Sequence, residues 1–240
     1  GLIGNHFYDS KFDDYYTLSN RSKVEDAKFY GGEPIWITAE KQNVKTASYF
    51  WVGTEAPIKN TYPSKWKKYE HNFPFEARID SIVAWLSLPE PKRPQFCMLY
   101  FHEPDATGHD TGPNSEETKL IVTKMDSLFG DLISKLETTP VAQHLNIIAV
   151  SDHGMAEISS KRTIQLSDYT DLSNIKQEGE GPYALLYSNN KKKLNQSIRD
   201  LKKVKHISAY LKKDIPERFH FKDHYRIKDA LVLADEGWYI

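Results

Sequence analysis

Apolar residues gather in short runs that alternate with polar stretches along the chain. Val44–Val52, Gln95–Phe101, Asn146–Val150 and Ala230–Ala234 are each a few residues long and mostly apolar. Runs of this length, bounded by polar residues, predict β-strands. Gln95–Phe101 and Asn146–Val150 are apolar almost without interruption, which is typical of strands that are buried on both faces of a sheet.

Other segments repeat their apolar residues at helical spacing. Phe75–Leu88 has Ile79, Ile82, Val83 and Leu86 on one face, and a proline-rich stretch follows it. This spacing predicts an amphipathic helix that ends before the prolines.

A second and longer helix is predicted between the strands at Gln95–Phe101 and Asn146–Val150. Asn114 is a candidate N-cap, and Glu117 three residues later completes a capping box. The apolar stripe of this helix consists of Ile121, Met125, Leu128, Phe129, Leu132 and Leu136. A third helix is expected at Leu194–Lys203, where we interpret the many lysines as solvated charge.

Strands that alternate with helices predict an α/β fold with a mostly parallel central sheet flanked by helices. Gln95–Phe101, the long helix and Asn146–Val150 form a strand–helix–strand unit. Such a unit predicts a parallel strand pair with a right-handed crossover. No internal repeat and no low-complexity linker divides the chain.

The two buried runs lead directly into residues that can bind a metal ion. Asp105 and His109 follow the first run, and their spacing places both on one side of a helical turn. Asp152 and His153 follow the second run, with Gly154 after them to relax the backbone. Because ligands bind at the carboxyl ends of parallel strands in open α/β sheets, we expect both pairs to face one crevice. Carboxylate oxygen with imidazole nitrogen favours zinc or manganese over calcium.

These ligands allow two interpretations. They can form one closed structural zinc site, or the incomplete halves of two catalytic sites that each need about three protein ligands. In the second case further ligands lie elsewhere. The local candidates, which we expect to be mostly structural, are His102, Glu103, Asp110, His144, His220 and His224.

Composition narrows the possible functions. The 240 residues carry a net charge of −1, which excludes a general electrostatic attraction to nucleic acid, and we expect no binding of nucleic-acid duplexes. An anionic substrate must therefore be held locally, for example by metal ions. The single cysteine, Cys97, lies in an apolar run and predicts a buried, inert thiol. No apolar stretch approaches the roughly 18 residues of a membrane-spanning helix, and no signal-peptide pattern opens the chain.

Several motifs, in this order, resemble one known family. They are Gly31-Gly32-Glu33-Pro34-Ile35-Trp36, Tyr49-Phe50-Trp51-Val52-Gly53, Glu103-Pro104-Asp105 with Gly108-His109, Ser151-Asp152-His153-Gly154-Met155 and Ala234-Asp235-Glu236-Gly237-Trp238. The chain is similar along its whole length to the type I phosphodiesterase/nucleotide pyrophosphatase family of the alkaline phosphatase superfamily. The resemblance implies that residues 1–240 are part of one catalytic domain with an alkaline phosphatase-like fold.

The resemblance also implies two Zn²⁺ ions in one active site. One ion would take Asp105 and His109 with a histidine that follows Ile240. The other would take Asp152 and His153 with an aspartate and a nucleophilic threonine or serine that precede Gly1. The expected chemistry is hydrolysis of phosphodiester or pyrophosphate bonds through a covalent phospho-enzyme.

Three residues are implied at the substrate. Asn5 matches an asparagine that donates a hydrogen bond to a phosphoryl oxygen. Tyr69 matches a tyrosine that stacks on the nucleotide base, and Trp51 would line the same pocket. Relatives act outside the cytoplasm, so we expect an extracellular, cell-surface or periplasmic protein whose substrate is a small nucleotide or another phosphodiester.

Other functions stay open at this point. One is another hydrolase of the superfamily: a phosphomonoesterase, a choline phosphodiesterase or a phosphonate hydrolase. A sulfatase that uses Cys97 is excluded, because its motif requires proline two residues later and Leu99 stands there. A catalytically inactive homologue that serves as a binding module is the alternative of a different class. The sequence does not specify the oligomeric state.

Overall fold

The computed structural model describes residues 4–240, and the chain forms two compact units. One consists of Ser19–Met155, and the other combines the described residues up to Leu18 with Ala156–Ile240. The assignment of the whole chain to one partial catalytic domain stays a prediction.

The Ser19–Met155 unit is built on a parallel sheet with the strand order β4-β3-β5. These strands are β3 (Thr46–Tyr49), β4 (Lys65–Lys67) and β5 (Phe96–Leu99). β3 and β5 pair in parallel from Thr46 opposite Phe96 to Tyr49 opposite Leu99. The strands predicted at Val44–Val52 and Gln95–Phe101 are therefore confirmed, each shortened at its ends.

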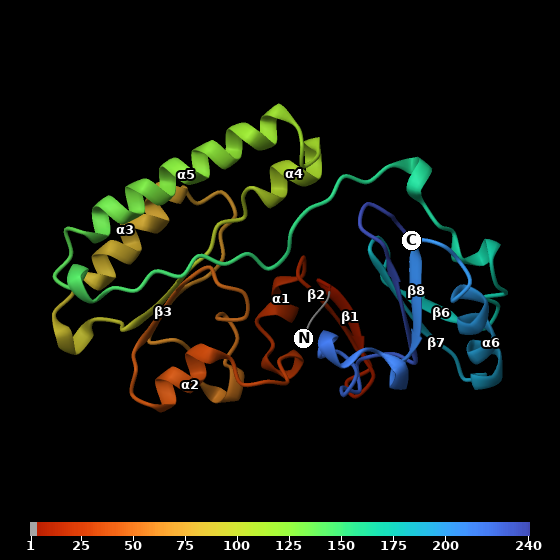
Figure 1. The fold of residues 1–240 in the computed structure, drawn as a ribbon. Coiled ribbons are helices and arrows are strands. Elements are labelled where there is room, and N and C mark those ends of the chain that lie inside the picture. The colour runs from red at the N-terminus through yellow and green to blue at the C-terminus, as the bar shows by residue number, and fades with distance from the viewer. Residues whose placement is uncertain (1–3) are drawn as a thin grey trace. The chain divides into compact units, whose positions relative to one another are not determined.

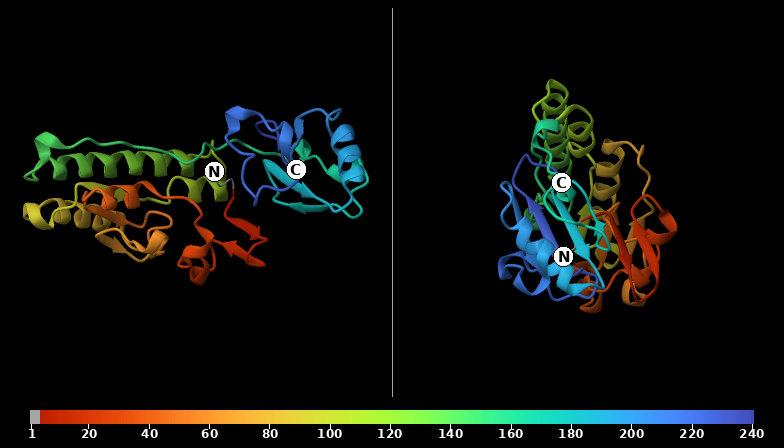
Figure 2. Two further views of the ribbon diagram at one scale, coloured as in Figure 1. Left: turned by 90° about the horizontal axis from the view of Figure 1, so that it is seen from below. Right: turned by 90° about the vertical axis from the view of Figure 1, so that its right-hand side faces the viewer.

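Helices cover both faces of this sheet (Figure 1). α3 (Phe75–Leu86) and α5 (Glu116–Leu136) run side by side on one face, as Figure 2 also shows. The residues that form the core on this face are Tyr49, Phe50, Ile82, Leu86 and Leu136. α2 (Ile35–Lys41) covers the other face, where Trp36, Ile37, Ala56, Ile58 and Met98 are buried. The short helices α1 (Arg21–Val24) and α4 (Asp105–Thr111) complete the unit.

The predicted start of the long helix is wrong by one residue. Ser115, not Asn114, is the N-cap of α5, and its hydroxyl accepts a hydrogen bond from the Thr118 amide at 3.0 Å. Serine and asparagine are comparable caps, so residue type alone does not decide between neighbours.

The predicted strand at Asn146–Val150 is not formed. The segment has no regular secondary structure, and Ile148 and Val150 are 83% and 69% exposed. The parallel pair with Gln95–Phe101 is therefore also absent. The apolar pattern indicates a buried strand, but a strand forms only where a neighbouring strand satisfies its backbone groups, and none of the described residues pairs with this one.

The other unit contains an antiparallel sheet with the order β6-β7-β9-β8. Its strands are β6 (Lys176–Glu178), β7 (Tyr183–Tyr187), β8 (Ile207–Leu211) and β9 (Ala230–Ala234), the last with the predicted bounds. α6 (Lys191–Leu201) packs on one face and begins earlier than predicted, since Asn190 caps it. A hairpin of β1 (His6–Asp9) and β2 (Asp14–Thr17) belongs to the same unit.

Among residues 4–240, no helix combines the length and the apolar character that crossing a membrane requires.

Candidate active site

The first predicted ligand pair lies on α4, which follows β5 after a short loop. The Glu103 carboxylate accepts hydrogen bonds from the Thr107 amide and from the Thr107 hydroxyl, both at 3.0 Å. These two bonds hold the first turn of the helix, whose N-cap position is Pro104. Asp105 and His109 then lie one turn apart on the same side, with 3.4 Å between Asp105 Oδ1 and His109 Nε2. The predicted proximity of this pair is thus observed.

The segment that carries the second predicted pair contacts α4 at Gly108, through Met155. A Cβ atom at Gly108 would lie 2.5 Å from the Sδ atom of Met155, so this contact needs glycine unless the methionine moves. The contact brings the segment of the second pair alongside the first. His153 Nε2 lies 3.6 Å from Asp105 Oδ1 and 3.7 Å from Asp152 Oδ2. The structure therefore gathers all the predicted ligands in one region of one unit.

A backbone hydrogen bond orients the His153 ring. Its Nδ1 lies 2.8 Å from the carbonyl oxygen of Gly154. Because a carbonyl can only accept, Nδ1 carries the proton, and Nε2 keeps its lone pair on the side of Asp105 and Asp152. The same hydrogen bond, together with the two carboxylates, raises the pKa of His153 above its ordinary value. This orientation is the one in which a histidine binds a metal through Nε2.

The Asp105 carboxylate has an unsatisfied oxygen. Its Oδ1 is buried and accepts no hydrogen bond, although His109 Nε2 and His153 Nε2 lie 3.4 and 3.6 Å away. Two donor atoms on one tetrahedral zinc are about 3.3 Å apart, given zinc–ligand bonds of about 2.0–2.1 Å. The donor set and its spacing fit zinc. Within residues 4–240, no three His, Cys, Asp or Glu side chains are placed to hold one ion together.

Two of the additional candidates have structural roles, as expected. Glu103 holds the first turn of α4. The ring of His102 stacks on His71 with 4.1 Å between centroids, and burial lowers the pKa of His102. A third candidate, His220, ends a short 3-10 helix in the left-handed conformation.

Asn5 belongs to the other unit. It lies immediately before β1, and its carbonyl oxygen accepts a hydrogen bond from the Leu18 amide at 3.0 Å, which closes the β1–β2 hairpin. Its side chain is exposed. The predicted contact between Asn5 and a phosphoryl group stays a prediction.

Trp51 lies in a tight turn after β3. Phe50 and Gly53 both have positive φ, 70° and 83°. The Ser48 hydroxyl accepts from the Trp51 amide at 3.2 Å, and the Thr54 hydroxyl donates to the Trp51 carbonyl oxygen at 2.7 Å. The half-buried indole packs against the core on the α2 side of the sheet. Local hydrogen bonds therefore fix the backbone that carries Trp51.

Tyr69 follows β4 and packs against the other core cluster, on the α3 side. Its ring meets Phe50 edge to face at 5.2 Å, and its hydroxyl lies 2.9 Å from Nδ1 of His71. Burial raises the pKa of Tyr69, so the phenol stays neutral at physiological pH. Trp51 and Tyr69 thus belong to different clusters, and both come from segments that follow parallel strands.

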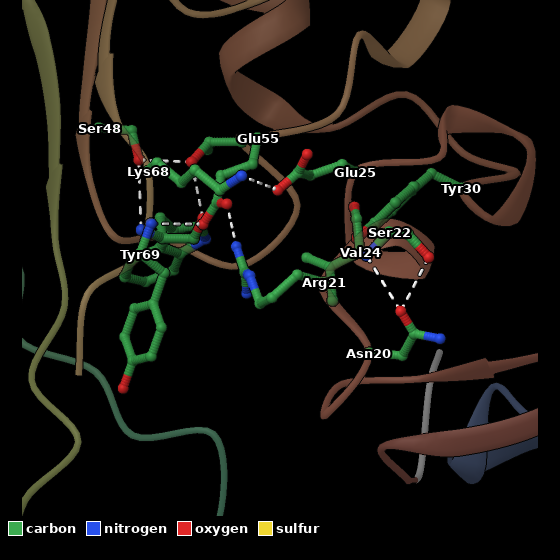
Figure 3. Close-up of polar contacts among 12 residues, drawn as sticks. Asn20, Arg21, Ser22, Val24, Glu25, Tyr30, Ser48, Glu55, Lys68 and Tyr69 are labelled. Atoms are coloured by element: carbon green, nitrogen blue, oxygen red, sulfur yellow. Dashed lines mark hydrogen bonds and ion pairs between the residues drawn. The ribbon is translucent and has the colours of Figure 1, made fainter.

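Two residues beside Tyr69, Glu55 and Arg21, were not predicted from the sequence. The buried carboxylate of Glu55 accepts a hydrogen bond from the Tyr69 amide at 2.9 Å and forms an ion pair with Arg21 (Figure 3). Arg21 comes from α1, far from Glu55 in the sequence. No spacing or motif signals such a pair.

Comparison with solved structures defines the class of fold. The chain superimposes over its full length on murine ectonucleotide pyrophosphatase/phosphodiesterase 5, with a TM-score of 0.88 and 30% identity, and covers 64% of that chain. The human protein of the same name gives a TM-score of 0.85 with 28% identity. The fold is thus the alkaline phosphatase-like α/β fold, with a parallel sheet flanked by helices, and the predicted fold class is confirmed.

The chain belongs to the type I phosphodiesterase/nucleotide pyrophosphatase family, whose family model matches residues 1–240. It is 36% identical over 246 residues to a venom phosphodiesterase of Naja atra. It is also 36% identical over 248 residues to ectonucleotide pyrophosphatase/phosphodiesterase family member 1 of Homo sapiens. Each alignment covers 99% of this chain but only 30% and 27% of the relative.

Proposed function

We propose that the complete protein hydrolyses phosphodiester or pyrophosphate bonds of nucleotides with the help of two zinc ions. The observation that carries the proposal is the Asp105 carboxylate, whose buried Oδ1 has no hydrogen bond and lies 3.4 and 3.6 Å from two imidazole Nε2 atoms. The Asp105 side chain as a whole is 48% exposed, but an enclosed oxygen without a hydrogen-bond donor is unfavourable, and a bound cation satisfies it. The family and the names of its relatives supply the reaction class.

Each ligand has a defined task in this proposal. Asp105 with His109, and Asp152 with His153, hold one zinc ion each. The Nδ1–H···O bond of His153 to Gly154 keeps Nε2 available for binding. When bound, the ions supply positive charge that lowers the pKa of an attacking hydroxyl and stabilises the phosphoryl oxygens.

In the first step the phosphoryl group of the substrate is transferred to a hydroxyl of the protein. A threonine or serine oxygen forms a bond to phosphorus, the bond to the leaving group breaks, and the leaving group departs with a proton. Water then cleaves the ester and restores the hydroxyl. The solved inactive murine variant, in which a threonine is replaced by alanine, supports this assignment. Asn5 donates its amide hydrogen to a phosphoryl oxygen as negative charge accumulates there.

The substrate class follows from the aromatic residues. Tyr69 stacks on the base and Trp51 lines the same pocket, which favours nucleotides over choline or simple alkyl phosphodiesters. The murine variant was solved in complex with AMP, which supports a nucleotide ligand. The venom and ectonucleotide relatives favour an extracellular or cell-surface location.

Zinc content and hydrolysis of p-nitrophenyl thymidine monophosphate test the proposal. We expect the purified complete protein to contain two zinc ions, to release p-nitrophenol and to stop when the metal is chelated. His153→Gln should lose one ion and at least about 100-fold in kcat/KM, because a metal ligand is removed.

His144→Gln is the matched control, since His144 lies in a short 3-10 helix outside the ligand cluster and its side chain is exposed. It should keep both ions and the wild-type rate. A zinc-free protein with full activity would refute the metal assignment. A zinc-loaded protein without hydrolysis would favour the binding-module alternative.

A further inference from the structure

Glu55 is a buried carboxylate outside the metal cluster. Its side chain is 5% exposed, and it lies in the Ser19–Met155 unit at the end of the turn that carries Trp51. A buried carboxylate at such a place needs hydrogen bonds and a positive charge. Glu55 has both, because Oε1 accepts from the Tyr69 amide at 2.9 Å and Oε2 pairs with Arg21.

The turn before Glu55 is held rigidly. Ser48 and Thr54 are completely buried, and their hydroxyl oxygens lie 2.7 Å apart. Thr54 in turn binds the Trp51 carbonyl oxygen with its backbone amide and its hydroxyl. Glu55 therefore stands at a fixed position one residue beyond this network. Through its bond to the Tyr69 amide it connects the turn of Trp51 to the segment of Tyr69.

Arg21 extends the same connection to the aromatic ring. Its guanidinium carbon lies 5.7 Å from the centroid of the Tyr69 ring, and its side chain is 35% exposed. A cation at this distance is attracted by the ring face. Figure 3 shows Arg21 reaching from α1 toward Glu55 and Tyr69. The carboxylate thus orients the arginine, and the arginine lies against the ring.

We infer that Glu55, acting with Arg21, is a positioning residue that sets Tyr69 and Trp51 for a nucleotide base. The inference rests on the proposed function, because it concerns the base pocket of that same site. Glu55 is not a catalytic residue, since its carboxylate contacts Tyr69 and Arg21. The pair acts by holding one aromatic residue at a defined place relative to the other, so its effect is on binding of the base and not on the chemical step.

Two substrates with the same leaving group separate these effects. p-Nitrophenyl thymidine monophosphate carries a base, and methyl p-nitrophenyl phosphate carries none. Glu55→Gln keeps an oxygen that accepts from the Tyr69 amide but removes the charge that holds Arg21. In the complete, metal-loaded protein we expect this variant to raise KM for the nucleotide ester about tenfold, with kcat changed less than about threefold. For the methyl ester, kcat/KM should stay within about twofold of the wild-type value.

Arg21→Gln should shift KM in the same direction, and it removes a more exposed group, so it keeps the test informative if Glu55→Gln fails to fold. The double variant should resemble Glu55→Gln alone, because residues that act as a unit are not additive. Glu90→Gln is the matched control, a neutralised carboxylate on an exposed side chain. It should behave as wild type with both substrates.

The outcomes distinguish failure of the proposed function from failure of the positioning role of Glu55. If the wild-type protein cleaves neither ester, the proposed function fails. The positioning role is overturned if the wild-type protein cleaves both esters and Glu55→Gln lowers activity on both to the same extent. It is also overturned if Glu55→Gln changes neither activity. In both cases the proposed function stands. A selective KM effect on the nucleotide ester supports the inference, because a general loss of stability would not distinguish substrates that share a leaving group.

Discussion

Cys97 shows how burial decides the chemistry of a single residue. It is the one cysteine of the chain and lies in β5, where its side chain is partly buried, less than predicted, and packs against the α3 side of the core. Burial raises its pKa to about 12. The thiolate is the reactive form, so at pH 8 the reactive fraction is about 1,000-fold smaller than for an ordinary thiol.

We therefore expect Cys97 to resist iodoacetamide at pH 8 in the folded protein and to react fully after denaturation. Peptide mass spectrometry can follow alkylation of the Cys97 peptide over time. Alkylation in the native protein at the rate of the denatured one would contradict the assignment of an inert thiol.

Arg78 illustrates a buried charge that is satisfied without a carboxylate. It is completely buried in α3. Its guanidinium donates to the carbonyl oxygens of Phe73 at 2.9 and 3.1 Å, of His71 at 3.0 Å and of Tyr100 at 3.0 Å. Tyr100 follows β5 and leads to the first ligand pair, so Arg78 holds the end of that strand. The planar fork makes these bonds together, and a lysine ammonium does not have its geometry.

Arg78→Lys should lower the free energy of unfolding by about 2–4 kcal/mol, because several buried carbonyl oxygens lose their donors. Urea-induced unfolding measures this change. Arg199→Lys on the exposed side of α6 should stay within about 0.5 kcal/mol of wild type. Equal effects of both substitutions would show that the carbonyl network contributes nothing specific.

At the scale of elements, the segment Asn146–Val150 is the clearest departure from the sequence pattern. Ile148 is 83% exposed, although the apolar pattern of the segment predicts a buried strand. Apolar strands are stable when their backbone groups pair and their side chains are covered. The chain spans about 30% of the length of its venom relative, so we expect a strand from outside the described residues to pair with this segment.

Hydrogen exchange on the complete protein tests that expectation. The amides of Ile147–Val150 should exchange at least about 100-fold more slowly than in an unpaired segment, as strand amides do. The amides of Gln143 and His144, in the exposed turn before the segment, serve as an internal reference. Fast exchange throughout Ile147–Val150 would refute the pairing.

Apolar periodicity predicted several elements from their own residues, even where the paired strand lies far away in the sequence. β3, β5, α3 and β9 follow from their own sequences, as do the ligand pairs on α4 and after Val150. Periodicity could not predict which strands pair, because pairing depends on residues outside the strand itself. The same limit applies to Arg21 and Glu55, whose contact depends on tertiary packing alone.

At the scale of the whole molecule, the proposed metal ligands are distributed unevenly. Asp105, His109, Asp152 and His153 all lie in the Ser19–Met155 unit, whereas the antiparallel sheet and Asn5 belong to the other unit. A ligand that binds only the native state stabilises the part of the protein that it binds, by about 2.7 kcal/mol when its concentration is 100 times Kd. Zinc should therefore stabilise the Ser19–Met155 unit more than the unit with the antiparallel sheet.

Removing zinc with a chelator from the complete protein should speed hydrogen exchange in α4 and in the Ser151–Met155 segment by about tenfold or more, because those segments carry the proposed ligands. Exchange in β7 and β9, which carry none of the ligands, should change less than about threefold. His153→Gln should reproduce the first effect without chelator, and His144→Gln should not. An equal change in exchange in both units would mean that zinc stabilises the protein through residues other than these ligands. No change in either unit would show that these residues do not bind zinc.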